Sequence, residues 1–94
     1  NWRGLRVVEL TPETADQLGY SEDEKGVLIT DVKAGSKGGL AGIQRGDIIK
    51  EINHIPVTTL KDYSAQMSKV KTSDTVQLLI KRGNAGFIVV KITK

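Results

Sequence analysis

The stretch GIQRGDIIKEINHIPV, residues 42–57, alternates turn signals with strand signals. Both of its glycines suit turns, because glycine adopts a positive φ without strain. Ile48–Ile52 is a short apolar run introduced by an aspartate, which is typical of a buried strand. Asn53 and His54 then indicate a tight turn into a very short strand at Ile55–Val57. The stretch therefore predicts two strands joined by a tight turn, and this pattern decides the fold.

Four further runs of apolar and β-branched residues predict strands on either side of this stretch. The last two of them flank the sequence GNAG, residues 83–86, which is a strong β-hairpin signal. Together with the central strands they predict a sheet of five to six strands. The four runs are Leu5–Leu10, Gly26–Val32, Thr75–Arg82 and Phe87–Thr93.

Short helices are predicted between the strands. Pro12–Leu18 follows a threonine suited to the N-cap and precedes a glycine suited to the C-terminal end. Ser36 predicts one capped helical turn, kept short by the two glycines that follow it. The clearest helix is Leu60–Val70, which Thr59 caps. These elements predict a compact α+β domain, a partly open β-barrel capped by two or three short helices.

The helix at residues 60–70 has further signals at both of its ends. Asp62 stands at the capping-box position, and Lys69 and Lys71 stand where positive charge favours the carboxyl end of a helix. Apolar residues recur at helical spacing and predict the buried face. They are Leu60, Tyr63, Met67 and Val70.

Length and composition indicate one small domain over residues 1–94. The net charge of +3 is spread along the chain and is too small to indicate a nucleic-acid partner. No apolar run reaches the roughly 18 residues of a membrane span, so we expect no direct membrane insertion. There is no cysteine for a disulfide or a thiol nucleophile. The chain begins with Asn1 rather than methionine, and we interpret it as a piece of a longer protein.

Residues that suggest chemistry all have a plainer interpretation. The Arg45-Gly46-Asp47 triplet is read as a structural turn, and His54, which lacks a neighbouring acid or serine, as a solvated turn residue. No serine lies in a G-x-S-x-G pattern. Lys81-Arg82 lacks the aromatic platform of a nucleic-acid site. We therefore expect no catalytic residue, no metal and no cofactor. An acidic group without metal-loop spacing is read as solvated surface: Asp16, Glu22, Asp23 and Glu24.

The amino-terminal sequence NWRGLRVVEL suggests a binding site instead. A glycine ahead of an apolar strand allows a sharp turn that leaves successive N–H groups unpaired, and such a concave run binds anions. The C-terminal carboxylate of a peptide is a natural guest, and the strand that follows would offer it a free edge. The alternative is that Gly4 is simply a flexible residue near a truncation point.

The whole chain resembles a PDZ domain of the permuted bacterial type, and above all the PDZ modules of HtrA/Do-like serine proteases. The resemblance lies in RGLRVVELTPETADQLG, in GVLITDVKAGSKGGLAGIQRGDIIKEINHIPVTTLKDY and in DTVQLLIKRGNAGFIVVKI. The order G-(L/I)-x-x-G-D-x-I-x-x-(I/V)-N-x-x-P-(V/I) within the second block is quite specific. In that family this block is scaffold, which agrees with the interpretation of residues 42–57 as architecture.

The resemblance implies that residues 2–5, Trp-Arg-Gly-Leu, form the carboxylate-binding loop. Backbone N–H groups around Gly4, Leu5 and Arg6 would hold a terminal carboxylate. Leu5 and Val7 would line one wall of the pocket for the last side chain, and Val8 would continue the peptide-binding strand. Ser64 and Met67 would form the opposite wall, with Leu60 near its far end. Arg3 departs from the apolar residue common in the loop, and with Arg6 it makes the loop unusually basic.

The resemblance also implies a parent protein, a periplasmic serine endoprotease whose catalytic triad lies in another domain. The partners would be C-termini or extended hydrophobic segments of misfolded envelope proteins, together with the protease domain and sister PDZ domains. The turn SKGGLAGI, residues 36–43, lacks a proline common in the family, which favours the second PDZ of a two-PDZ protease. Three alternatives stay open: an oligomer-assembly module, a PDZ of a tail-specific or intramembrane protease, and, remotely, a basic barrel that binds nucleic acid.

Overall fold

The computed structural model describes residues 3–71, 74–83 and 86–92. Six strands and three short helices make up these residues, so the α+β class predicted from the sequence is confirmed. In chain order they are β1 (Leu5–Glu9), α1 (Pro12–Gln17), β2 (Val27–Val32), α2 (Lys37–Leu40), β3 (Ile48–Ile52), β4 (Ile55–Pro56), α3 (Leu60–Met67), β5 (Val76–Arg82) and β6 (Gly86–Ile92).

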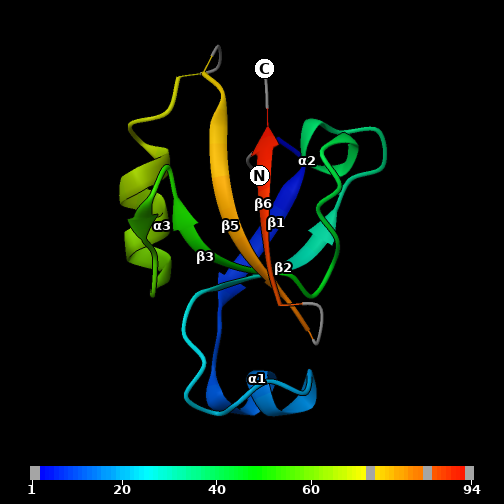
Figure 1. Ribbon diagram of the computed structural model, residues 1–94, viewed down its shortest axis with the longest axis vertical. Helices are drawn as coiled ribbons and strands as arrows, with labels where there is room; N and C mark the ends of the chain where they lie inside the picture. Colours follow the sequence, from blue (N-terminus) through cyan, green and yellow to red (C-terminus); the bar gives the residue numbers. More distant parts are fainter. Residues whose placement is uncertain (1–2, 72–73, 84–85, 93–94) are drawn as a thin grey trace.

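The strands form one open antiparallel sheet with the order β1-β2-β3-β5-β6, and the two-residue β4 pairs with β3 beside this path. Strands β1 and β6 therefore lie at the two margins of the sheet. Figure 1 shows α3 on one side of the strands and α2 on the other, near the start of β1. None of the helices in the described residues is long and apolar enough to cross a membrane.

The structure confirms the two strands and the tight turn predicted within residues 42–57. Asn53 and His54 both have positive φ, 50° and 70°, and they join β3 to β4 in the predicted tight turn. The carboxylate of Asp47 is 1% exposed and accepts hydrogen bonds from Arg82 Nε at 2.9 Å and Arg82 Nη2 at 2.7 Å. It also accepts the N–H of Gln44 at 2.9 Å. These bonds fix the turn that precedes β3, and the bonds to Asp47 raise the pKa of Arg82.

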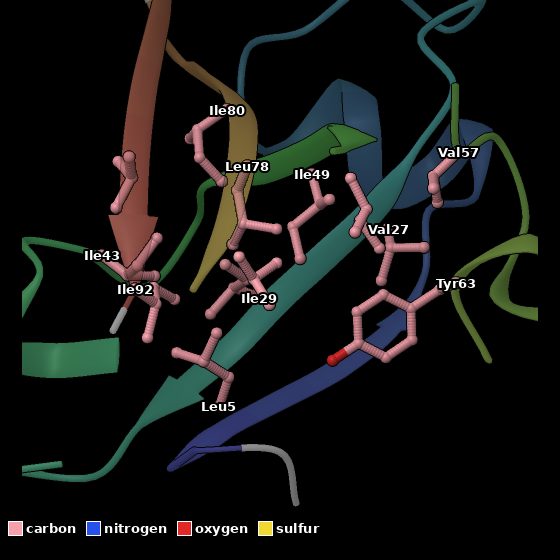
Figure 2. Packing of buried hydrophobic residues seen from close by; sticks show 13 residues of the cluster. Leu5, Val27, Ile29, Ile43, Ile49, Val57, Tyr63, Leu78, Ile80 and Ile92 are labelled. Carbon is pink, nitrogen blue, oxygen red and sulfur yellow. The ribbon is translucent and has the colours of Figure 1, made fainter. Parts of the chain in front are cut away.

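The main core lies on the face of the sheet that α3 covers. Figure 2 shows its side chains, drawn from every strand except β4 and from α3. A smaller cluster on Leu28 and Ile48 packs against Leu10 and Ala15, and so attaches α1. The main cluster consists of Leu5, Val27, Ile29, Ile43, Ile49, Ile52, Val57, Tyr63, Val76, Leu78, Ile80, Val90 and Ile92.

The longest helix differs from its prediction at its carboxyl end. It ends at Met67 rather than Val70, so Lys69 and Lys71 lie beyond its last turn. At the other end, Asp62 accepts hydrogen bonds from the N–H and the hydroxyl of Thr58. The bonds from Thr58 lower the pKa of Asp62. The Thr59 hydroxyl accepts the Asp62 N–H at 3.1 Å, as an N-cap should.

One of the acidic residues interpreted as solvated surface is not solvated. The side chain of Glu24 is 9% exposed and forms ion pairs with Lys50 and Lys81. Burial raises the pKa of Glu24, but the hydrogen bonds from the two lysines outweigh it, and the net pKa is lowered. The prediction failed because both lysines lie more than 25 residues away along the chain, on β3 and β5.

Candidate functional site

The loop that leads into β1 has a backbone shape that the sequence predicts only in part. Arg3 and Gly4 both have positive φ, 47° and 86°. The carbonyl of Arg3 accepts the N–H of Gly38 at 3.0 Å, and the carbonyl of Gly4 accepts the N–H of Lys33 at 2.8 Å. A Cβ on Gly4 would lie 2.2 Å from the Cβ of Ser36. The loop therefore rests on the segment around α2, and only glycine fits at position 4.

The register of β1 fixes which backbone groups face the open margin of the sheet. Leu5 pairs with Val32 and Glu9 pairs with Val27. Next to the first pair, Lys33 donates its N–H to the carbonyl of Gly4. Next to the second pair, Leu10 donates its N–H to the carbonyl of Gly26 at 3.4 Å. Because these bonds lie just outside each pair, the paired residues do not bond to each other. The N–H and C=O groups of Leu5, Val7 and Glu9 therefore point away from β2.

The same alternation directs the N–H of Arg6 toward β2. Three amides were expected to hold a carboxylate, and those of Gly4 and Leu5 remain available for it. Within the described part of the chain, neither of these two N–H groups donates to a carbonyl. The arrangement is an open strand edge with free amides at its start. A chain-terminal carboxylate and an extended peptide are the guests that such a margin can pair with.

The guanidinium of Arg3 does not face this margin. Its Nη1 donates to the carbonyl of Ile92 at 2.9 Å, and its Nη2 donates to the carbonyls of Asp74 at 2.8 Å and Lys71 at 3.3 Å. The side chain thus joins the loop to β6 and to the segment that leads into β5. Sequence reasoning placed Arg3 at the site as a positive charge, and the structure shows it as a brace for the loop.

The first side chains of β1 meet the side chains of α3 in one cluster. Leu5 and Tyr63 are buried in the main core, and the half-buried Val7 and Met67 pack against it. At the other end of β1, the carboxylate of Glu9 accepts the N–H of Leu60 at 2.9 Å, which joins the strand to the start of the helix. Leu5, Val7 and Met67 thus belong to one apolar cluster, and Leu60 lies beside Glu9 at the far end of β1.

Three other residues expected at the site lie outside this cluster. The side chains of Arg6 and Val8 are exposed and alternate to the opposite face of the sheet. Ser64 is exposed on α3. Trp2, the aromatic residue of the expected loop, lies outside the described residues.

Tyr63 is a feature that sequence reasoning missed. The residue is 7% exposed, and its hydroxyl is the buried side-chain polar atom without a hydrogen-bond partner within the described chain. Burial raises the pKa of Tyr63 to about 12. Figure 2 shows the ring reaching from α3 over β1, with its hydroxyl directed toward the end of the strand where Leu5 lies. Its helical spacing indicated an apolar contact and gave no signal of the unpaired oxygen.

Beside the loop is an open polar cleft with a volume of about 450 Å³. Its lining includes Lys33 and Lys37, which give this end of β1 a positive character suited to an anion. No cluster of three or more His, Cys, Asp or Glu residues that could hold a metal ion occurs among the residues that the structure describes.

Comparison with known proteins shows which family has this fold. The profile of the PDZ domain matches residues 1–81. A probable periplasmic serine endoprotease, DegP-like, of Chlamydia pneumoniae is 35% identical over 89 residues, which are 94% of this chain and 18% of the relative. The putative serine protease HhoB of Synechocystis is 33% identical over 87 residues, 85% of this chain and 21% of the relative. The chain thus spans about a fifth of the length of these relatives.

Two solved structures have the same fold. The HtrA-type protease AlgW with a decapeptide superposes with a TM-score of 0.85 at 22% identity, over 98% of this chain and 28% of that one. The HtrA3 PDZ domain bound to the phage-derived ligand FGRWV superposes with a TM-score of 0.79 at 25% identity, over 98% of this chain and 82% of that one. From the match over residues 1–81 and the shared fold, the chain belongs to the PDZ domain family and is similar to the PDZ domains of HtrA and DegP-like serine proteases.

Proposed function

We propose that this chain is the peptide-capturing PDZ module of a periplasmic DegP-like serine endoprotease. It takes up C-termini or extended hydrophobic segments of misfolded envelope proteins by strand addition at β1, and it thereby regulates proteolysis by a catalytic domain elsewhere in the parent. The proposal includes the assignment to the second PDZ of a two-PDZ parent. Its relatives named as periplasmic endoproteases support the location and the parent, and the HtrA3 complex with FGRWV supports the ligand class.

The main observation behind the proposal is the free edge of β1 with two available amides at its start. The N–H groups of Gly4 and Leu5 would hold the terminal carboxylate, and the outward groups of Val7 and Glu9 would pair with the peptide backbone. Lys33 and Lys37 supply positive charge at the carboxylate end. A short extended contact of this kind is suited to micromolar affinity, which allows recruitment and release.

The chain does no chemistry of its own in this proposal. The lone histidine, His54, is exposed, and its Nε2 lies 3.3 Å from the side-chain nitrogen of Gln77. The buried carboxylate of Asp47 accepts two hydrogen bonds from the guanidinium of Arg82. Neither is arranged as a general acid or base beside a nucleophile.

A second candidate function is assembly, in which the domain packs against another domain of the parent. It is favoured by two large apolar side chains on the opposite margin of the sheet: Phe87 on β6 is 61% exposed and Val89 is 58% exposed. An apolar pair on a strand at a sheet margin is a feature of contact surfaces. This surface is separate from the β1 edge, so the two functions are compatible in one domain.

The test is an NMR titration of the domain with the peptide FGRWV and with the same peptide amidated at its C-terminus. Capture by strand addition predicts saturable shifts of the Leu5, Val7 and Glu9 amides, and an affinity for the amidated peptide at least about tenfold lower, because a charged acceptor is lost. Equal affinity for both peptides would exclude carboxylate capture. Shifts confined to Phe87 and Val89, together with self-association, would favour assembly.

A further inference from the structure

The hydroxyl of Tyr63 is an unpaired polar atom beneath the proposed peptide site. It is closed off from solvent and has no hydrogen-bond partner within the described residues. Leaving a buried donor unpaired is costly, and an occupant that supplies the missing bond gains that free energy on binding. Tyr63 is the one such case that the described residues show. The half-buried Tyr20 is the matched control, because its hydroxyl accepts the Gly83 N–H at 2.7 Å and lies 3.2 Å from the carbonyl of Gly46.

The position of this hydroxyl connects it with the pocket for the last side chain of a peptide. Tyr63 and Leu5 belong to one buried cluster, and the half-buried Val7 of β1 and Met67 of α3 pack against it. In Figure 2 the hydroxyl is directed toward the Leu5 end of β1, where the free amides of Gly4 and Leu5 would hold the carboxylate. A side chain that enters beside that carboxylate would therefore approach the phenol.

One side chain that packs against the same cluster as Tyr63 can give way. Met67 is half-buried and unbranched, and methionine re-packs at little cost because three of its bonds rotate freely. Displacing it would admit the last side chain of a peptide between β1 and α3. The other described residues of this cluster are apolar, so the phenol is the group in it that can distinguish a hydroxyl on the ligand from a methyl or a hydrogen of the same shape.

We propose that Tyr63 is a specificity-determining residue, and that its hydroxyl makes the pocket accept a last residue that is apolar in shape but bears a hydroxyl group. This inference rests on the proposed function and adds the chemistry of the ligand's final side chain. A purely apolar pocket rejects such a hydroxyl because it must be desolvated without a partner. Tyr63 supplies the partner, as donor or as acceptor.

The experiment compares two isosteric pairs of peptides that place a hydroxyl at different depths: FGRWV with FGRWT, and FGRWF with FGRWY. Dissociation constants are measured for the unmodified domain, for Tyr63→Phe and for Tyr20→Phe. We expect Tyr63→Phe to lower the affinity for the hydroxyl-bearing peptide of one pair by about 3- to 10-fold, relative to the affinity for the other peptide of that pair. This change corresponds to the loss of one neutral hydrogen bond. Tyr20→Phe should leave both ratios unchanged, since Tyr20 packs with the cluster on the opposite face of the sheet.

The outcomes separate this inference from the proposed function. For each pair of peptides, the ratio of the two dissociation constants is compared between Tyr63→Phe and the unmodified domain. If all peptides bind and both ratios agree within twofold, the inference is wrong and peptide capture stands. If none of the four peptides binds the unmodified domain, peptide capture itself is wrong. Phenylalanine has nearly the same shape as tyrosine, so the variant keeps the packing, and a thermal unfolding curve verifies that it is folded.

Discussion

Gly4 combines a positive φ with a close contact, and these two constraints can be separated experimentally. Gly4 and Gly19 have nearly the same φ, 86° and 84°, but a Cβ on Gly19 would meet nothing within 4 Å, whereas one on Gly4 would overlap Ser36. Alanine at either position incurs the strain of the left-handed conformation, about 1 kcal/mol. Only at position 4 must the loop also move.

We therefore predict that Gly4→Ala lowers peptide affinity by at least about tenfold, because the displaced amides no longer face the carboxylate. It should also reduce the free energy of unfolding by more than Gly19→Ala does. Chemical denaturation and a titration with FGRWV measure the two effects. Equal losses of affinity in the two variants would show that the shape of the loop does not matter.

The unpaired hydroxyl of Tyr63 predicts an unusual sign for a core substitution. Tyr63→Phe removes a buried polar group that has no partner among the described residues, so we expect it to stabilise the free domain by about 1 kcal/mol. Tyr20→Phe should destabilise it, because the Gly83 N–H loses its acceptor. Thermal unfolding measures both. Destabilisation by Tyr63→Phe would indicate that a bound water satisfies the phenol.

Alkaline pH tests the burial of the same group. Tyrosine in the unfolded chain ionises near pH 10, whereas burial raises the pKa of Tyr63 to about 12 in the folded state. The contribution of Tyr63 is therefore complete below pH 10, and stability falls as the pH rises from 10 toward 12, by about 1 kcal/mol per pH unit. Tyr63→Phe should lack this component of the fall. Parallel alkaline unfolding curves for the two proteins would contradict it.

At the scale of elements, the register of β1 predicts an alternating pattern of hydrogen exchange. The amides of Arg6 and Val8 point to β2 and should be protected with or without ligand. The amides of Leu5, Val7 and Glu9 point outward, so they should exchange fast in the free domain and slow down on addition of FGRWV. Amide-resolved exchange by NMR measures this. Uniform protection along β1 in the free domain would show that its edge is already covered.

Local chemistry explains which elements could be predicted from the sequence. The turn at Asn53-His54 and the capped starts of α1 and α3 depend on neighbouring residues, and each was predicted. The end of α3 was wrong by three residues, because its apolar spacing continues to Val70 after the helix has ended. Val70 still packs against the core, so the spacing predicted its burial correctly and its conformation incorrectly.

At the scale of the whole molecule, long-range contacts decide what the site looks like, and these had no local signal. The sequence placed Leu5, Val7 and Met67 at the site only through a family resemblance, and the fold places them at one apolar cluster although they are far apart along the chain. The bond between Glu9 and Leu60 and the unpaired oxygen of Tyr63 depend on how the helix lies over the sheet. Neither property is encoded in the spacing of residues along one segment.

Arg3 is the clearest case, because its role reverses between sequence and structure. As a cation beside a carboxylate loop it suggests direct anion capture, but its guanidinium donates to the carbonyls of Lys71, Asp74 and Ile92. Those acceptors lie 68 to 89 residues away, so Arg3 connects the start of the chain to its last strand. Three donors in a planar fork suit this arrangement, and the ammonium of lysine does not reproduce it.

Arg3→Lys therefore separates the two roles, because it keeps the charge and loses the fork. If Arg3 braces the loop, the variant should lose about 1–2 kcal/mol of unfolding free energy. Its affinity for FGRWV should be severalfold lower than that of the unmodified domain. Added salt should leave the ratio of the two affinities unchanged, because both proteins carry the same number of charges. Denaturation and titrations at two salt concentrations measure this. If Arg3 captured the carboxylate by charge, Arg3→Lys would bind nearly as well as the unmodified domain and would be nearly as stable. The hydrogen bonds of Arg3 would then not be needed to hold the loop in its binding shape.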